Sequence, residues 1–252
     1  MSTLFQGLPA AKVTPALAFL VGLVLAPASA LSQTGTIAGT VSVSGTPPAT
    51  RMLEVNKNQD VCGAEIQATD VVIENGLLAY GVAFVDGLEG EVTPQEHKLS
   101  NSGCSFDPPV MSVAAGSVLL VDNQDEVLHN THLNFVLGAR TRTVGNWALS
   151  SKGSKITADR PLRRAGIIEV ECDAHSWMHA KIHIFAHPYF SVTDASGRFE
   201  IADVPEGVHV VKIQHEVFGE LEQEVTVTAG AAASADFVYV MTSGIDMEPD
   251  EQ

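Results

Sequence analysis

Short runs of β-forming residues recur along the chain, and this pattern limits the fold more than any other feature of the sequence. The runs are rich in Val, Ile and Phe or alternate apolar with polar residues, and Gly, Pro, Asn or Asp bounds them. They are Thr36–Ser44, Leu77–Val85, Ser117–Val121, Leu133–Leu137, Ile167–Glu171, Ala180–Phe185, Arg198–Ile201, Val208–Gln214 and Glu222–Val227. No long stretch has helical spacing. The sequence predicts an all-β protein of sandwiches, with 141–164 as a polar connection holding one short helix.

The first thirty residues have the layout of a secretory signal peptide. Lys12 precedes an apolar run, Ala16–Leu25, and the small residues Ala28 and Ala30 follow it. The run is shorter than the ~20 residues that a membrane span requires. We therefore favour cleavage after Ala30 over a membrane anchor, and we expect a periplasmic or secreted protein with no membrane span after cleavage. At the other end, 241–252 is acidic without an apolar period and is expected to be disordered.

The formal net charge of the chain is −16. A surface this acidic repels phosphate, so nucleic acid is excluded as a partner. It suits a protein partner with a basic docking surface, although solubility alone also accounts for the charge.

The segment between two predicted strands carries three side chains that bind soft metals. In Cys172-Asp-Ala-His175-Ser-Trp-Met178 a thiol, an imidazole and a thioether follow one another at intervals of three residues. Soft sulfur ligands together with imidazole select copper, and two His, one Cys and a weak axial Met form the usual electron-transfer set. A buried structural thiol for Cys172 and core packing for Met178 are the plainer alternatives.

A second histidine is needed from an earlier loop, and two candidates follow the predicted strand that ends at Val121. His129 and His132 have opposite parity in an extended segment, so they cannot both face one site. We favour His129, because it lies in the loop whereas His132 begins the next strand. Asn130 is expected to tie the two loops together by hydrogen bonds.

These residues resemble those of the cupredoxins, the small blue copper proteins. His129-Asn130 and Cys172-x-x-His175-x-x-Met178 are similar to the amicyanin pattern, and the likeness spans about 110–185. The resemblance implies one type 1 copper held by His129, Cys172 and His175 with Met178 axial. It also implies an electron carrier rather than an enzyme, a redox partner such as a cytochrome or dehydrogenase, and electron transfer through a solvent-exposed edge of His175. Ser176 replaces the proline that the family usually has after the second His.

The other two cysteines, Cys62 and Cys104, both lie in turn-like contexts. Because an exported compartment is oxidising, we predict that they form a disulfide, which would leave Cys172 free for metal. Two free thiols are the alternative.

The C-terminal part resembles carboxypeptidase regulatory-like, transthyretin-type β-sandwiches over about 189–239, on the motif Thr193-Asp194-Ala-Ser-Gly197-Arg-Phe199. We therefore divide the chain into a signal peptide (1–30), a Greek-key cupredoxin-like copper domain with an N-terminal extension (31–187), a small regulatory-like sandwich (188–240) and the tail (241–252). The strand over 36–48 also resembles the first strand of such domains, and we expect it to join the C-terminal sandwich.

Two rival functions stay open from the sequence. One is a binding module that docks a partner or glycan through its sandwiches, and the other is copper handling without electron transfer. His179, His183 and His187 share one strand face, but residues four apart lie ~13 Å from each other, so they are not expected to share one ion. His215 is expected to have a structural role.

Overall fold

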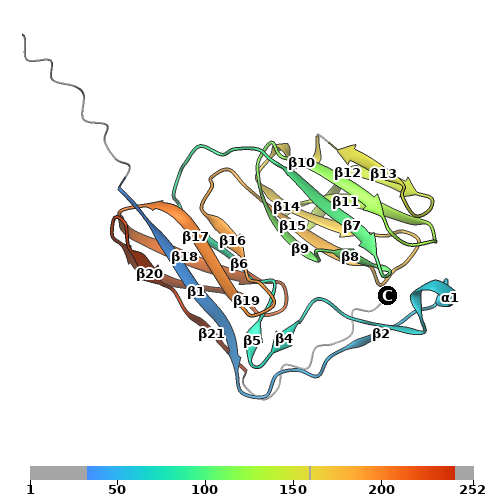
Figure 1. The fold of residues 1–252 in the computed structure, drawn as a ribbon, viewed down its shortest axis with the longest axis horizontal. Coiled ribbons are helices and arrows are strands. Elements are labelled where there is room, and N and C mark those ends of the chain that lie inside the picture. The colour runs from blue at the N-terminus through green and yellow to red at the C-terminus, as the bar shows by residue number, and fades with distance from the viewer. Residues whose placement is uncertain (1–32, 159, 242–252) are drawn as a thin grey trace, which may run out of the picture. The chain divides into compact units, whose positions relative to one another are not determined.

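The computed structural model describes residues 33–158 and 160–241, and its regular structure is almost entirely β (Figure 1). The predicted signal peptide and all but the first residue of the predicted tail lie outside these residues. The strands are β1 (Thr34–Ser44), β2 (Met52–Glu54), β3 (Glu65–Gln67), β4 (Ile73–Glu74), β5 (Leu77–Leu78), β6 (Val82–Val85), β7 (Glu96–Ser102), β8 (Ser105–Asp107), β9 (Val110–Ala114), β10 (Val118–Asn123), β11 (His129–Leu137), β12 (Arg140–Leu149), β13 (Lys155–Ala158), β14 (Gly166–Glu171), β15 (His179–Phe185), β16 (Phe190–Val192), β17 (Arg198–Pro205), β18 (Gly207–His215), β19 (Gly219–Val227), β20 (Ala232–Ser234) and β21 (Phe237–Val240). The predicted all-β fold class is confirmed.

Two short helical turns complete the described structure. They are α1 (Gln59–Cys62) and the 3₁₀ turn η1 (Pro161–Arg163). No helix in the described part of the chain is long and apolar enough to span a bilayer. The polar segment 141–164 is not the long connection that we predicted, because most of it forms β12 and β13. Most of β12 lies exposed or half-buried, so its sequence lacks the apolar alternation that would have identified it.

The first sandwich consists of two sheets that share one apolar core. One sheet has the strand order β13-β10-β7-β8 and the other β12-β11-β14-β15-β9. Side chains from both sheets meet in a single buried cluster, with Leu99 and Leu119 from the first sheet and Leu133, Ile168 and Ile182 from the second. β11 and β14 pair side by side, with His132 opposite Glu171, so the loops before β11 and after β14 emerge at the same end.

The second sandwich is assembled from strands that are far apart in the sequence. One sheet has the order β17-β1-β5-β4, with β20 and β21 also paired to β1, and the other has β16-β6-β18-β19. β1 runs antiparallel to β17 and parallel to β20 and β21, as the expectation that it joins the C-terminal sandwich requires. β6 pairs with β16 and β18. Strand pairing therefore divides the chain differently from our boundary between 31–187 and 188–240, because β1 and β4–β6 contribute to the second core.

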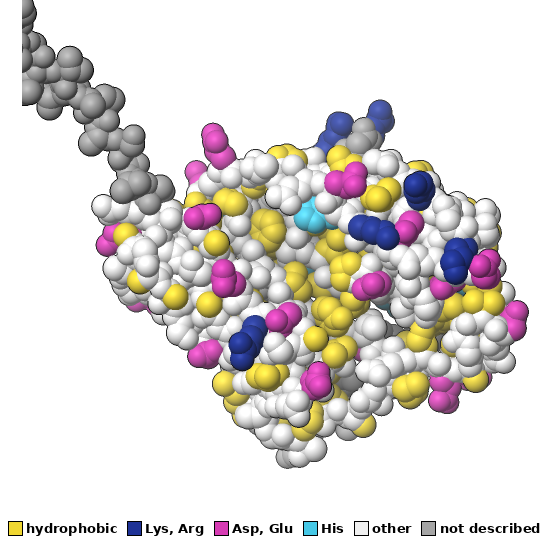
Figure 2. All heavy atoms as spheres, in the orientation of Figure 1, with side chains coloured by type: hydrophobic (Ala, Val, Ile, Leu, Met, Phe, Trp, Pro, Cys, Tyr) yellow, Lys and Arg dark blue, Asp and Glu magenta, His cyan; other side chains and the backbone are white. Residues whose placement is uncertain are grey.

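The surface agrees with the acidic composition. Acidic side chains are spread over the face shown in Figure 2, with Lys and Arg side chains interspersed among them rather than gathered into one basic patch. The charge of this face thus offers no sign of a surface that would attract a polyanion.

Candidate metal centre

The loop between β14 and β15 is a compact turn that buries the three residues of the Cys-x-x-His-x-x-Met motif. The backbone N–H of His175 donates to the carbonyl of Cys172 at 3.1 Å, and that of Met178 donates to the carbonyl of His175 at 3.0 Å. The N–H of Cys172 in turn donates to the carbonyl of Met178 at 3.3 Å, which closes the loop. All three side chains are buried. The loop is therefore fixed by its own backbone hydrogen bonds.

The loop between β10 and β11 is held by one buried asparagine. The side-chain amide of Asn123 donates to the carbonyls of Val127 and Leu149, at 2.8 and 2.9 Å. Its side-chain oxygen accepts the backbone N–H of Asp125 at 2.8 Å, as in an Asx turn. These bonds fix the start of β11 and place His129, which is fully buried, at the end of the first sandwich.

The two loops bring His129, Cys172 and His175 together. The Nδ1 atoms of the two histidines lie 3.0 Å apart, and the Sγ of Cys172 lies 3.7 Å from Nδ1 of His175. One ligand atom from each of the three residues lies within 4.8 Å of the other two. His132, the rejected candidate, is not part of this group. Its Nδ1 faces Asp173 at 2.9 Å and its Nε2 faces Thr143 at 2.8 Å.

The partners of the outer ring nitrogens decide which nitrogens carry hydrogen. Nε2 of His129 lies 3.0 Å from Oδ2 of Asp125, and a carboxylate oxygen only accepts. Nε2 of His175 lies 2.9 Å from Oδ1 of Asn58. These partners favour the hydrogen on Nε2 of both histidines, which leaves the two Nδ1 atoms facing one another beside the sulfur. Metal-binding histidines show this arrangement, with the far N–H held by a carboxylate or carbonyl oxygen.

Electrostatics keep the two rings neutral at neutral pH. Burial is the main cause that lowers the pKa of His129, and the hydrogen bond that its ring donates to the Asp125 carboxylate opposes this by raising the pKa. Burial, followed by the nearby His129 and Lys57, lowers the pKa of His175 to about 4. The backbone N–H of Asn130 points at the sulfur of Cys172 at 3.4 Å. Two neutral imidazoles and one cysteine sulfur fit a soft or borderline cation such as copper.

Side chains around the centre bind the two loops to one another. The amide of Asn130 donates to Asn146 and to the carboxylate of Asp173, at 2.8 Å each. Asn130 thus makes the cross-loop contact that we expected. Asp125 also accepts the backbone N–H groups of Gly103 and Cys104, at 2.9 and 2.8 Å, from the turn between β7 and β8.

Met178 is fully buried in the first core, on the loop that holds Cys172 and His175. Its role as a fourth ligand stays a prediction. Cys62 and Cys104 form the predicted disulfide, and Cys172 is the one free cysteine.

The expected solvent-exposed edge of His175 is absent, which corrects one implication of the resemblance. Only 1% of His175 is accessible, and the neighbouring Trp177 is itself buried. The indole N–H of Trp177 donates to the carbonyl of Cys104 at 3.1 Å, and its ring packs 4.9 Å from that of His175. Asn58, the residue at the outer nitrogen of His175, was missed because it lies 117 residues away in sequence. Asp125 was also missed as the hydrogen-bond partner of His129, although a carboxylate four residues before the histidine could have suggested it.

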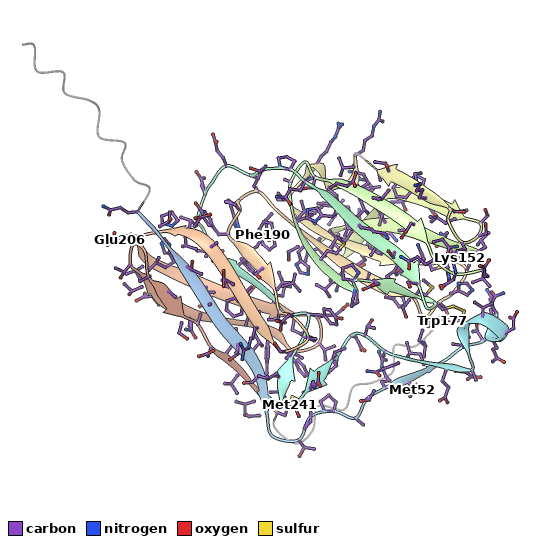
Figure 3. All side chains as sticks on the ribbon, in the orientation of Figure 1. Met52, Lys152, Trp177, Phe190, Glu206 and Met241 are labelled. Carbon is purple, nitrogen blue, oxygen red and sulfur yellow. A yellow bond between two sulfur atoms is a disulfide. The ribbon has the colours of Figure 1, made fainter. Side chains whose placement is uncertain are left out.

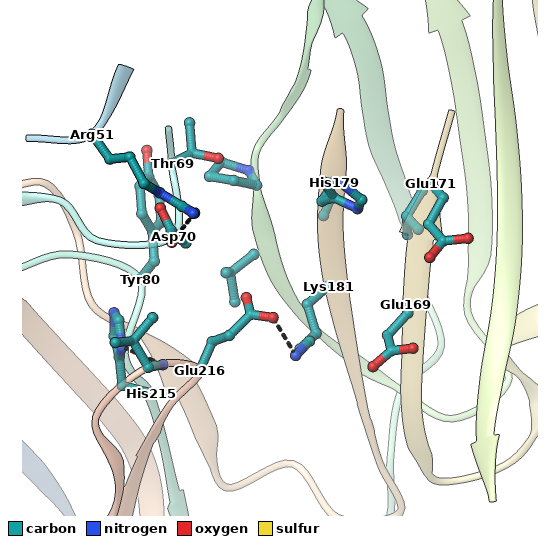
Figure 4. Close-up of a pocket in the computed structure, with 15 residues that line it drawn as sticks. Arg51, Thr69, Asp70, Tyr80, Glu169, Glu171, His179, Lys181, His215 and Glu216 are labelled. Atoms are coloured by element: carbon teal, nitrogen blue, oxygen red, sulfur yellow. Dashed lines mark hydrogen bonds and ion pairs between the residues drawn. The ribbon is translucent and has the colours of Figure 1, made fainter. Parts of the chain in front are cut away.

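The other histidines do not join this group. His179 is exposed and donates from Nε2 to the carbonyl of Ser176 at 2.7 Å, whereas His183 is buried. A separate cavity of about 620 Å³ is lined by His179 and His215 among others, and by two ion pairs (Figure 4). These pairs join Arg51 to Asp70 and Lys181 to Glu216, at 2.6 Å each. None of the three grouped ligand candidates lines this cavity.

Comparison with solved structures returns cupredoxins and a copper-containing nitrite reductase, all at low overall similarity. A purple cupredoxin from Nitrosopumilus maritimus is 15% identical, with a TM-score of 0.30 and coverage of 35% of this chain and 98% of that one. Auracyanin A from Chloroflexus aurantiacus, described as a blue copper protein, is 17% identical, with a TM-score of 0.30 and coverage of 37% and 100%. A reduced amicyanin mutant is 20% identical, with a TM-score of 0.29 and coverage of 41% and 98%. No family model and no curated protein matches the sequence. TM-scores this low carry no inference about this chain.

Proposed function

We propose that this chain is an exported copper protein that carries single electrons, with His129, Cys172, His175 and Met178 as ligands of one type 1 copper. The observation that carries the proposal is the convergence of two imidazole lone pairs and a thiol sulfur in a buried space. The two Nδ1 atoms are 3.0 Å apart, and each ring holds its hydrogen on the far side. Two lone pairs that face each other in this way repel, and a cation between them turns this repulsion into attraction.

The residues of the chain hold and orient the centre rather than take part in bond-making. Copper, when bound, supplies a site that gains and loses one electron. Asp125 and Asn58 fix the rings of His129 and His175, and the N–H of Asn130 stabilises the anionic sulfur of Cys172. The buried loops exclude water, so little solvent rearranges when the charge of the centre changes. In this proposal no residue acts as a general acid, a general base or a nucleophile, and the chain is not an enzyme.

The partner in this proposal is a redox protein such as a cytochrome or dehydrogenase, with a basic docking surface. The support is the charge of the chain, −16 over 252 residues, because oppositely charged surfaces accelerate encounter between proteins. Raising the salt concentration should then slow electron transfer to the partner, since salt screens charges at the surface.

The test is the visible spectrum of the purified protein after addition of copper(II). A thiolate bound to copper(II) gives an intense visible absorption band, so we expect a strongly coloured protein. Cys172→Ser should abolish the band, and His129→Ala should abolish or shift it. His132→Ala is the matched control, because that ring faces Asp173 and Thr143 instead of the centre, and it should keep the band. A colourless copper complex of the unmodified protein would refute the proposal.

A further inference from the structure

A hairpin from the N-terminal part of the chain packs on the first sandwich, and we call residues 51–68 the strap. Its arms are β2 and β3, which pair with Leu53 opposite Ile66. Val55 is fully buried in the first core, and Leu53 and Ile66 pack against that core while partly exposed. The strap therefore has its own apolar attachment to the sandwich that carries the metal centre. In Figure 3 the labelled Trp177 lies beside the α1 end of the strap.

The tip of the strap contacts the loop that carries Cys172 and His175. Asn58 places Oδ1 at 2.9 Å from Nε2 of His175, and the ammonium group of Lys57 donates to the carbonyl of Ala174 at 3.1 Å. Two neighbouring residues of the strap thus bind two neighbouring residues of the ligand loop. Together with Trp177 and the surrounding core, they leave the ring of His175 with 1% of its surface accessible.

A covalent bond fastens the same tip to the turn between β7 and β8. Cys62, the last residue of α1, forms the disulfide with Cys104. The backbone of Cys104 also contacts both sides of the centre. Its carbonyl accepts the indole N–H of Trp177, and its N–H donates to Asp125, the partner of His129. One short segment therefore links the strap to the residues that support both histidines.

The backbone at Asn58 explains why this residue type stands there. Its φ and ψ are 54° and 37°, in the left-handed region. Gly adopts this region freely, and Asn and Asp are the side chains that tolerate it best. Of these three, only Asn and Asp also offer an oxygen that can accept the N–H of His175. The position combines a turn requirement with a hydrogen bond to a ligand candidate.

We infer that the strap is a disulfide-fastened cover over the copper centre, and that Asn58 is a positioning residue that fixes the hydrogen of His175 on Nε2. This inference rests on the proposed function for its copper part. The cover closes the edge of His175 to solvent and slows exchange of the metal. The Asn58 oxygen keeps the Nδ1 lone pair of His175 free to face Cys172. A partner must then exchange electrons across Asn58 or through another side of the first sandwich.

The first experiment uses three matched variants of the full chain. Asn58→Gly removes the oxygen and keeps a residue suited to the left-handed backbone, and Asn58→Asp keeps both the oxygen and the backbone. Asn75→Gly is the control, because Asn75 is an exposed residue with φ 52° in the turn between β4 and β5, which belong to the second sandwich. The measurement is the rate at which the copper(I) form loses its metal to a chelator.

We expect Asn58→Gly to release copper about tenfold faster or more, the size of effect usual for a residue that supports a metal ligand. Asn58→Asp should restore slow release, and Asn75→Gly should match the unmodified protein. The double variant Cys62→Ser with Cys104→Ser should also release copper faster, because the tip of the strap loses its covalent attachment. Unchanged release from Asn58→Gly would overturn the inference.

A second measurement separates this inference from the proposed function, because it uses the copper-free protein. The nitrogen chemical shifts of a neutral imidazole identify which nitrogen carries the hydrogen. We expect His175 to carry it on Nε2 in the unmodified protein and in Asn58→Asp, and on both nitrogens in a mixture in Asn58→Gly. If these shifts depend on Asn58 while copper gives no visible band, the positioning role stands and the electron-carrier proposal fails. If the visible band is present and the nitrogen chemical shifts of His175 are the same with and without the Asn58 side chain, the positioning role is refuted and the electron-carrier proposal stands.

Discussion

The two sandwiches are built on the same plan and treat their buried polar groups differently. Each has two sheets around one apolar cluster. In the second sandwich the buried Thr193 donates to the carbonyl of Leu78 and accepts the N–H of Gly81, and Nδ1 of the buried His215 accepts the N–H of Val217. Backbone groups thus bind Thr193 and one nitrogen of His215, and in the described part of the chain His215 belongs to no group of metal-ligand candidates.

In the first sandwich two buried histidines are held by side chains, and each keeps one ring nitrogen without a backbone partner. His129 and His175 bind Asp125 and Asn58 through Nε2, and their Nδ1 atoms have no backbone partner. The sulfur of Cys172 lies beside them. The difference is therefore one of grouping: the loops at one end of the first sandwich bring two imidazoles and a sulfur together, and each imidazole has one nitrogen held by a side chain.

The largest expected effect concerns the disulfide, which fastens the strap to the first sandwich. Replacing Cys62 and Cys104 by Ser should lower the free energy of unfolding by about 4 kcal/mol, the entropic value for a loop of this size. The two residues are 42 apart in sequence. Urea denaturation of the copper-free protein measures the effect, with tryptophan fluorescence for the first sandwich, which holds Trp147 and Trp177, and circular dichroism for both sandwiches together. The loop between the cysteines includes β4–β6 of the second sandwich, so an equal loss in both sandwiches would show that they unfold as one unit.

A pair of core substitutions compares the two sandwiches directly. Leu133 in β11 and Ile213 in β18 are both fully buried. Leu133→Ala and Ile213→Ala should each cost about 3 kcal/mol of unfolding free energy, through lost burial and the cavity left behind. Only Leu133→Ala should also speed copper release, because Leu133 lies four residues after His129 on the same strand. Faster release from Ile213→Ala would mean that the second core supports the centre.

A smaller effect is expected from pH, because His183 in the first sandwich and His215 in the second are buried away from the candidate metal centre. Burial lowers the pKa of His183 in β15 and of His215 in β18 to about 4 in each case. Both are neutral in the folded protein, while the unfolded chain takes up a proton below about pH 6.5. Stability should therefore be complete above pH 6.5 and fall toward pH 4, by about 1.4 kcal/mol per pH unit for each histidine.

Denaturation of the copper-free protein at pH 7, 6 and 5 measures this slope. His183→Gln and His215→Gln should each reduce the slope by the contribution of one histidine, about 1.4 kcal/mol per pH unit. A slope that neither variant changes would show that these rings take up protons in the folded state.

The smallest effect is expected at the surface of the first sandwich. Lys152 and Glu126 form an ion pair at 3.7 Å with side chains 61% and 70% exposed. Lys152→Ala should change the unfolding free energy by less than about 0.5 kcal/mol, since solvent screens such pairs. The visible spectrum of the copper form should also stay the same, although Glu126 neighbours Asp125. A changed spectrum would indicate that a surface charge next to the loop between β10 and β11 alters the copper centre.

Local sequence patterns determined the β character of the chain and the candidates for the metal centre. Alternation, branched residues and turn residues depend only on neighbours in the sequence. The predicted runs accordingly correspond to β1, β5, β6, β10, β11, β14, β15, β17, β18 and β19. The spacing Cys172-x-x-His175 and the opposite parity of His129 and His132 are also local features of the sequence. The structure brings Cys172, His175 and His129 together.

Only the tertiary structure decided which distant segments meet. The resemblance of 36–48 predicted that β1 joins the C-terminal sandwich, but the strands with which it pairs, β17, β20 and β21, depend on packing energy gained after long loops close. β12 and β13 were missed because exposed strands need no apolar alternation. The cover over His175 could not be predicted either, because it also depends on contacts between segments that are far apart in the sequence. Asn58 and His175 are 117 residues apart, and their contact exists only once the strap has packed on a finished core.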